Sequence, residues 1–227
     1  MTDLLDIKKL SVSFQTEYET TYAVRDVSIT LSQGEVLGIV GERGAGKSTI
    51  GNAIVNLLEP PGEITTGEVL FKGQDLRNLD DKQMRDVRGK KIGMIFQDPQ
   101  TSLNPLMTIG AQLIETINKT INLYGSEATN KAIDLLESVG IDEPVARLNL
   151  YPHQFSGGMR QRVVIALALA GNPDLIIADE PTTALDVSIQ AQILDLIKKL
   201  CKERQVGVII ITHDIGCLLY TSDAADE

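Results

Sequence analysis

Residues 41 to 49 combine glycines, a lysine and hydroxyl side chains at a spacing that suits phosphate binding. They read G-E-R-G-A-G-K-S-T and contain the pattern G-x-x-x-x-G-K-S. Glycines let backbone N–H groups turn toward phosphate oxygens, and a helix N-terminus adds partial positive charge. Lys47 would neutralise the β and γ phosphates, and Ser48 would offer its hydroxyl to Mg²⁺. The residues expected to form this loop are Gly41, Gly44, Ala45, Gly46, Lys47, Ser48 and Thr49.

The segments on either side of the loop favour nucleotide triphosphate chemistry. An apolar run at 36–40 is short enough for a buried parallel strand, and residues 48–58 follow with the pattern of a helix. A strand, a glycine-rich turn and a helix are the setting that phosphate binding requires. The alternative is a turn of this shape that binds nothing.

Two adjacent carboxylates end a second apolar run. Residues 175–180 read L-I-I-A-D-E, which is typical of a strand buried on both faces whose C-terminal end opens onto a site. Asp179 would hold Mg²⁺ through water, and Glu180 would orient or deprotonate the attacking water. The alternative is a carboxylate pair that caps the turn before Pro181.

A second helix start offers another anion site. Ser156, Gly157 and Gly158 precede an apolar stretch that runs to residue 170, so Ser156 is expected to be the N-cap. The two glycines admit close backbone approach, and the helix dipole favours a γ phosphate there. A capped, buried helix without a ligand is the alternative for a lone S-G-G.

Composition narrows the class of protein. A chain of 227 residues that is 43% hydrophobic can bury one sizeable α/β core, and the net charge of −10 argues against a nucleic-acid partner. The longest apolar stretches are too short to cross a bilayer, and residues 1–6 do not read as a signal peptide, so we expect a cytoplasmic chain. The two cysteines, Cys201 and Cys217, have no metal-ligand spacing.

Together these motifs resemble an ATP-binding-cassette (ABC) ATPase. The resemblance spans residues 5–216 and rests on the phosphate loop, S-G-G-M-R-Q-R at 156–162, D-E-P-T-T-A-L-D at 179–186 and T-H-D at 212–214. The segments I-F-Q-D-P-Q-T-S-L-N-P at 95–105 and D-V-S-I-Q at 186–190 are similar to the dipeptide, oligopeptide and nickel importer branch.

The resemblance implies roles for further residues. Gln97 matches the loop glutamine that reaches both the Mg²⁺ and water site and the membrane partner. His213 matches the switch histidine that contacts the γ phosphate, and Asp186 matches the loop that communicates across a dimer. In this family the signature of one protomer covers the nucleotide held by the other, so that Ser156, Gly157 and Gly158 would act on the partner's ATP.

Two positions near the nucleotide are less uniform. Phe14 occupies the family position of the aromatic that stacks on adenine, although Tyr22, just before Ala23, is an alternative. Arg43 departs from the branch, which usually carries a small residue there. It could tighten phosphate binding, but we expect it to point to solvent.

The order of predicted elements indicates an α/β fold. Strand-like segments at 6–14, 24–31, 35–41, 68–72, 91–97, 174–179 and 206–212 alternate with helical ones at 47–58, 81–87, 108–124, 126–139, 157–170 and 187–203. The resemblance implies a P-loop NTPase with a parallel core sheet, an N-terminal antiparallel β subdomain and an inserted helical subdomain at about 98–171. Residues 1–216 would form one cassette domain, truncated at its C-terminus, and 217–227 resemble a translated sequencing adapter. We therefore expect 217–227 to be non-native and the natural reading frame to have been cut near Gly216; a genuine short C-terminal tail is the alternative.

The resemblance implies a peripheral ATPase on the cytoplasmic face of the membrane. It would use ATP and Mg²⁺ to energise import of peptides of the di- or oligopeptide or nickel type. Its partners would be a second ATPase subunit, identical or different, separate permease subunits and an extracytoplasmic substrate-binding protein. The alternatives are an ABC ATPase that acts on ribosomes or DNA, and a regulatory subunit that binds ATP without hydrolysing it.

Overall fold

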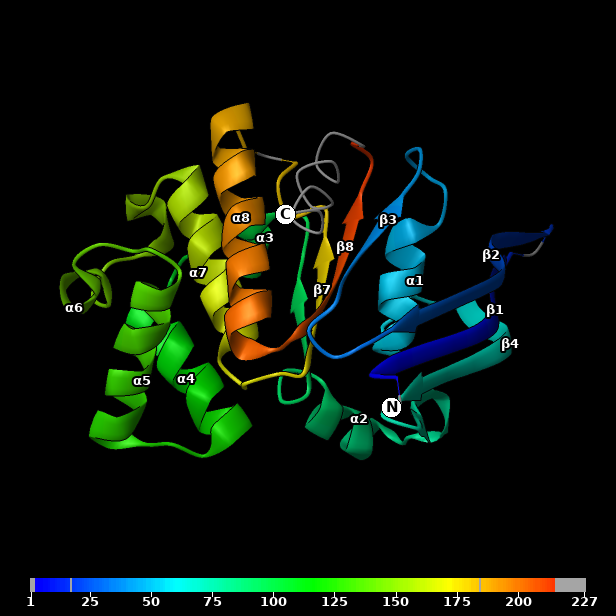
Figure 1. The fold of residues 1–227 in the computed structure, drawn as a ribbon, viewed down its shortest axis with the longest axis horizontal. Coiled ribbons are helices and arrows are strands. Elements are labelled where there is room, and N and C mark those ends of the chain that lie inside the picture. Colours follow the sequence, from blue (N-terminus) through cyan, green and yellow to red (C-terminus); the bar gives the residue numbers. More distant parts are fainter. Residues whose placement is uncertain (1–2, 17, 184, 215–227) are drawn as a thin grey trace.

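The molecule is built from two four-stranded sheets with helices between and beside them (Figure 1). The computed structural model describes residues 3–16, 18–183 and 185–214, and the tail expected at 217–227 lies outside the described residues. Helix α1 (Lys47–Ile54) lies between the sheets, while helices α7 (Gly157–Leu169) and α8 (Val187–Arg204) cover the other face of the central sheet. This arrangement, with an antiparallel and a parallel sheet, confirms the predicted fold class.

The central sheet is parallel, and both of its faces are buried. Its strands are β3 (Val36–Val40), β6 (Ile92–Ile95), β7 (Leu175–Asp179) and β8 (Gly207–Thr212), in the order β3-β8-β7-β6. Every residue of β7 and β8 is buried, as expected for strands covered by helices on both sides. Because side chains alternate along a strand, Ile177 and Ile209 pack on the side of α1, whereas Ala178 and Ile210 pack with α7 and α8.

The second sheet is antiparallel and lies beyond α1. It consists of β1 (Leu5–Gln15), β2 (Thr20–Leu31), β4 (Gly62–Phe71) and the two-residue β5 (Gln74–Asp75), in the order β2-β1-β4-β5. The register shifts where Lys9 and Asp26 adopt positive φ angles of 48° and 49°. Such irregularities bend the sheet, and its inner face supplies one apolar cluster together with α1.

Helices occupy the chain between β6 and β7. They are α3 (Pro99–Ser102), α4 (Ile109–Ile121), α5 (Gly125–Ser138), α6 (Pro144–Arg147) and α7, with no strand among the described residues, as predicted. Apolar side chains of α4, α5 and α7 share one core with α8 and the central sheet. The assignment of residues 98–171 to a separate subdomain stays a prediction.

Helix α8 carries an apolar stripe. Ile193, Leu196, Ile197 and Leu200 are all buried against the sheet. The short helix α2 (Asp81–Val87) begins with Asp80, whose side chain accepts from the Gln83 N–H in a capping box. Within the part of the chain that is described, no helix has the length and apolarity needed to span a bilayer.

Some predicted boundaries are wrong. Strand β4 starts at Gly62 rather than at residue 68, because its first half also pairs with β1. Most side chains of this first half are exposed, so the sequence there has no apolar alternation that would indicate a strand. Helix α1 ends at Ile54 rather than at residue 58, and α3 and α6 were not predicted. Helices of four residues are too short to give a periodic signal.

Gly171 is predicted to be essential for stability. A Cβ there would lie 1.8 Å from the Gly89 carbonyl oxygen, because the end of α7 contacts the turn before β6. Gly171→Ala should therefore lower the free energy of unfolding by about 3 kcal/mol in urea titrations. Lys199→Ala, on the exposed side of α8, is the control and should change it by less than about 0.5 kcal/mol. Equal unfolding midpoints for the two variants would contradict the tight approach.

Candidate functional site

The phosphate loop joins the end of β3 to the start of α1, as the sequence predicted. Gly44 and Gly46 both have φ angles of +81°, a conformation that favours glycine. A Cβ on Gly46 would lie 2.0 Å from the carbonyl oxygen of Ala23 in β2, so no other residue fits at this position. The antiparallel sheet thus presses directly against the loop and helps to set its shape.

Lys47 is held over the loop by backbone carbonyls. Its residue is 7% exposed, and its Nζ donates to the carbonyl oxygens of Gly41 and Glu42 at 2.8 Å each. An ammonium group so placed is a fixed positive charge beside the backbone N–H groups of the loop. This places the positive charge at the phosphate loop, while the role of Lys47 toward the outer phosphates of a nucleotide stays a prediction.

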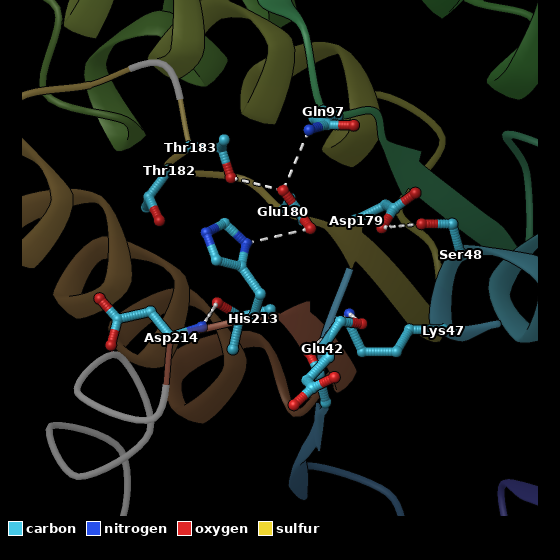
Figure 2. A network of polar contacts seen from close by, with 12 residues as sticks. Glu42, Lys47, Ser48, Gln97, Asp179, Glu180, Thr182, Thr183, His213 and Asp214 are labelled. Carbon is cyan, nitrogen blue, oxygen red and sulfur yellow. Dashed lines mark hydrogen bonds and ion pairs between the residues drawn. The ribbon is translucent and has the colours of Figure 1, made fainter. Parts of the chain in front are cut away.

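Ser48 and Asp179 bring two oxygen ligands together from α1 and β7. Ser48 Oγ donates to Asp179 Oδ1 at 2.9 Å (Figure 2). Mg²⁺ prefers oxygen ligands and commonly combines one or two protein groups with substrate phosphates. Among the described residues no cluster of three or more His, Cys, Asp or Glu side chains could hold a metal by itself. The pair therefore fits Mg²⁺ only if phosphate oxygens and water complete the coordination.

Glu180 stands at the centre of the polar network. Its carboxylate accepts from Gln97 Nε2 at 3.0 Å and from Thr183 Oγ1 at 2.8 Å, and lies 3.1 Å from His213 Nδ1 (Figure 2). The side chain is 9% exposed, and the backbone has a φ of +46°, which is strained for a residue with a Cβ. The Glu180 N–H donates to the Ile211 carbonyl at 2.8 Å, so β8 helps to hold this conformation.

The pKa values of the two neighbouring carboxyl groups shift in opposite directions. Burial raises the pKa of Asp179, and the adjacent Glu180 raises it further, while the hydrogen bond from Ser48 only partly offsets these effects. Burial also opposes ionisation of Glu180, but the hydrogen bonds from Thr183 and His213, together with the electrostatic attraction of His213 and Lys47, outweigh it and hold the pKa of Glu180 below its ordinary value. Glu180 is therefore the better charged acceptor of the two.

These groups surround a cavity of about 370 Å³. Its lining residues are Ala23, Arg43, Gly44, Gly46, Lys47, Ser48, Thr49, Gln97 and Glu180. Its lining surface is mainly polar, which suits a phosphate chain better than an apolar ligand. Arg43 is exposed and also lines this cavity, so the expectation that it only points to solvent stays a prediction.

The second predicted anion site lies apart from this cavity. Ser156 caps α7 by accepting from the Met159 N–H at 3.3 Å, as predicted. Gly157 packs near Leu185, and a Cβ on Gly158 would lie 2.9 Å from Ile189 Cγ2 in α8. Ser156, Gly157 and Gly158 do not line the cavity of their own chain, and neither does Asp186, which precedes α8.

The two candidate aromatic residues have different surroundings. Phe14 is partly buried and packs against the apolar cluster of the antiparallel sheet, with its ring 2.7 Å from where a Cβ on Gly62 would lie. Tyr22 is 45% exposed, and the Arg25 guanidinium lies 4.9 Å from its ring centre. Tyr22 also precedes Ala23, which lines the cavity. The assignment of adenine stacking to Phe14 stays a prediction.

Sequence reasoning missed two contributors to the site. Thr183 donates to Glu180, and Ala23 forms part of the cavity wall. The first had a signal in the T-T pair two residues after Glu180, where a hydroxyl can turn back toward a carboxylate. Ala23 had none, because only its backbone position beside Gly46 matters.

Comparison with protein families and curated proteins gives consistent matches. Residues 24–183 match the family model described as "ABC transporter". The chain is 54% identical over 224 residues to "Oligopeptide transport ATP-binding protein OppD" of Bacillus subtilis (strain 168), covering 98% of this chain and 63% of that protein. It is 49% identical over 215 residues to "Dipeptide transport ATP-binding protein DppD" of Escherichia coli (strain K12), covering 94% of this chain and 65% of that protein. The chain thus spans slightly less than two thirds of these curated relatives.

Solved structures share the fold. The ATP-binding cassette MJ0796, in a dimeric post-hydrolysis state bound to ADP and Pi, is 34% identical with a TM-score of 0.82, covering 95% of this chain and 90% of that one. The structure of cbiO1 from Clostridium perfringens, part of a cbiONQ complex, is 27% identical with a TM-score of 0.80, covering 97% and 82%.

Because the pKa values of Asp179 and Glu180 shift in opposite directions, neutral substitutions at the two positions should change stability in opposite directions. Asp179→Asn should raise the free energy of unfolding at pH 7 by roughly 1 kcal/mol, because it removes a buried charge beside Glu180 and keeps an acceptor for Ser48. The gain should shrink as the pH falls through the pKa of folded Asp179, since the native carboxyl is then protonated. Glu180→Gln should lower stability at pH 7, because the pKa of Glu180 is depressed and its charge is stabilising. Urea titrations from pH 7 down through the pKa of folded Asp179 test the sign of both changes in the free energy of unfolding. A loss of stability for Asp179→Asn at pH 7 would contradict the role of burial.

Proposed function

The chain belongs to the ABC transporter family, and we propose that it hydrolyses ATP to energise the import of peptides through separate permease subunits. The observation that carries this proposal is the carboxylate of Glu180, held by Gln97, Thr183 and His213 at the wall of the cavity that the phosphate loop lines. A binding protein without hydrolysis would need the loop but would not need this carboxylate. The peptide cargo is supported by the names of the relatives, which describe oligopeptide and dipeptide transport.

Hydrolysis would proceed by in-line attack of water on the γ phosphate. Glu180 would accept the proton of that water, because its carboxylate is ionised and lies on the cavity wall. Lys47 would balance charge on the outer phosphates, and His213, which is 34% exposed beside Glu180, would donate to the γ phosphate. Mg²⁺ bound at Ser48 and Asp179, with Gln97 nearby, would neutralise phosphate charge.

A second ATPase subunit would complete each site. Ser156, Gly157, Gly158 and Asp186 lie outside the cavity of their own chain, although the S-G-G helix start is suited to an anion. This separation supports the arrangement implied by the family, in which these residues cover the nucleotide of a partner protomer. The partner could be a second copy or a related subunit, and the solved MJ0796 cassette, which shares this fold, is dimeric.

The permease would dock on an apolar groove beside Gln97. The groove has a volume of about 570 Å³ and runs along the edge strand β6, between the ends of α1 and α7. Leu57 and Phe96 line it and are 40% and 45% exposed. Phe96 directly precedes Gln97, so a permease segment in the groove would sense the contact between Gln97 and Glu180. This would place the protein on the cytoplasmic face of the membrane, with an extracytoplasmic binding protein delivering the peptide.

Glu180→Gln tests the proposed hydrolysis. The variant should bind ATP as the wild type does, but its rate of phosphate release should fall at least about 100-fold, because no general base remains. Loaded with ATP, it should accumulate as a dimer in size-exclusion chromatography. Glu137→Gln, on α5, is the control and should hydrolyse ATP normally. Normal phosphate release by Glu180→Gln would overturn the role assigned to Glu180.

Leu57→Glu tests the docking groove. A charge in the apolar groove should abolish co-purification with the permease, whereas ATP binding by the ATPase alone should not change. Tyr124 is 62% exposed and lies outside the groove, so Tyr124→Glu should leave co-purification intact. Retention of the permease by Leu57→Glu would show that it docks elsewhere.

A further inference from the structure

Arg43 is a second cation on the wall of the phosphate cavity. The side chain is exposed, and the residue lines the cavity together with Lys47 and Glu180. Without Arg43, the charged groups of the lining would be one lysine and one carboxylate, which cancel. With Arg43 the lining carries a net positive charge, which suits a ligand with several negative charges.

The guanidinium of Arg43 has no protein partner in the described part of the chain. No hydrogen bond or ion pair joins it to a described residue, and the adjacent Glu42 carboxylate, although exposed, does not pair with it. Other arginines contrast with this: Arg77 pairs with Asp75 at 2.7 Å, and Arg88 donates to the carbonyl oxygens of Val55 and Asn56. The five N–H donors of Arg43 are thus free to bind a ligand.

The position of Arg43 along the loop indicates which phosphates it would reach. Lys47 Nζ contacts the carbonyl oxygen of Glu42, and Arg43 is the next residue. A lysine at this place in a phosphate loop binds the β and γ phosphates. Arg43 therefore lies at the end of the loop that faces these phosphates. A guanidinium binds phosphate oxygens in a bidentate manner, which a small residue at this position could not do.

We propose that Arg43 binds the terminal phosphate of the nucleotide and makes the site discriminate ATP from ADP more strongly than the loop backbone and Lys47 would alone. This inference rests on the proposed function, because it presupposes that the cavity holds ATP. It assigns to the one unusual residue of the loop a role in retaining the triphosphate and releasing the diphosphate.

The test is calorimetric titration with Mg·AMP-PNP and Mg·ADP at fixed ionic strength. Arg43→Ser should bind AMP-PNP about fivefold more weakly than the wild type, and ADP less than about twofold more weakly, as expected for an exposed charge pair. Arg43→Lys should weaken AMP-PNP binding less than Arg43→Ser does, because it keeps the charge but loses the bidentate geometry. The loss in Arg43→Ser should shrink at high salt. Arg85→Ser, an exposed arginine of α2 outside the cavity, is the matched control and should bind both nucleotides normally.

The outcomes separate this inference from the proposed function. If Arg43→Ser bound both nucleotides as tightly as the wild type, or lost the same factor for both, the role of Arg43 would be overturned while ATP binding stood. If the wild type bound neither nucleotide, the proposed function itself would fall.

Discussion

A carboxylate that is both nearly buried and ionised constrains the whole site. Desolvation of Glu180 favours its neutral form, and hydrogen bonds together with the electrostatic attraction of His213 and Lys47 offset this effect. The groups that contact this carboxylate are Gln97 after the end of β6, Thr183 in the loop after β7, and His213 after the end of β8. The left-handed backbone of Glu180 is tolerated because the same contacts, and the Ile211 carbonyl, hold the residue in place. Geometry at this one carboxylate therefore depends on the register of three parallel strands.

Close backbone approaches at glycines fix the position of the other elements relative to the site. Gly46 lets the Ala23 carbonyl approach the phosphate loop, which couples the antiparallel sheet to the site. Gly171 and Gly93 bring the end of α7 against the edge of the central sheet, and Gly158 brings its start against α8. The helix that carries S-G-G is thus positioned relative to the strand that carries Glu180 by contacts in which a side chain would not fit.

Much of this architecture could be predicted from the sequence, where the signal is local and periodic. The strand at 174–179 and the helix at 187–203 agree with β7 and α8 to within a residue, because burial on both faces and a helical stripe leave clear patterns. The first half of β4 left no pattern, because its side chains are mostly exposed and only its backbone pairing makes it a strand. The same reason explains why Ala23 escaped notice: its carbonyl, not its side chain, meets the loop.

The sequence by itself determined that a phosphate loop and a helix start with S-G-G are present, because both depend on glycine and hydroxyl side chains within a few residues of each other. It also paired the loop with the two carboxylates through their place at the ends of predicted strands. Only the tertiary structure decided which groups touch Glu180 and in which direction the pKa of each carboxyl shifts, because Gln97 is 83 residues away along the chain and the pKa of each acid depends on its burial and on the groups around it. It likewise decided that Arg43 lines the cavity, because the direction of an exposed side chain depends on the walls around it rather than on its neighbours in sequence.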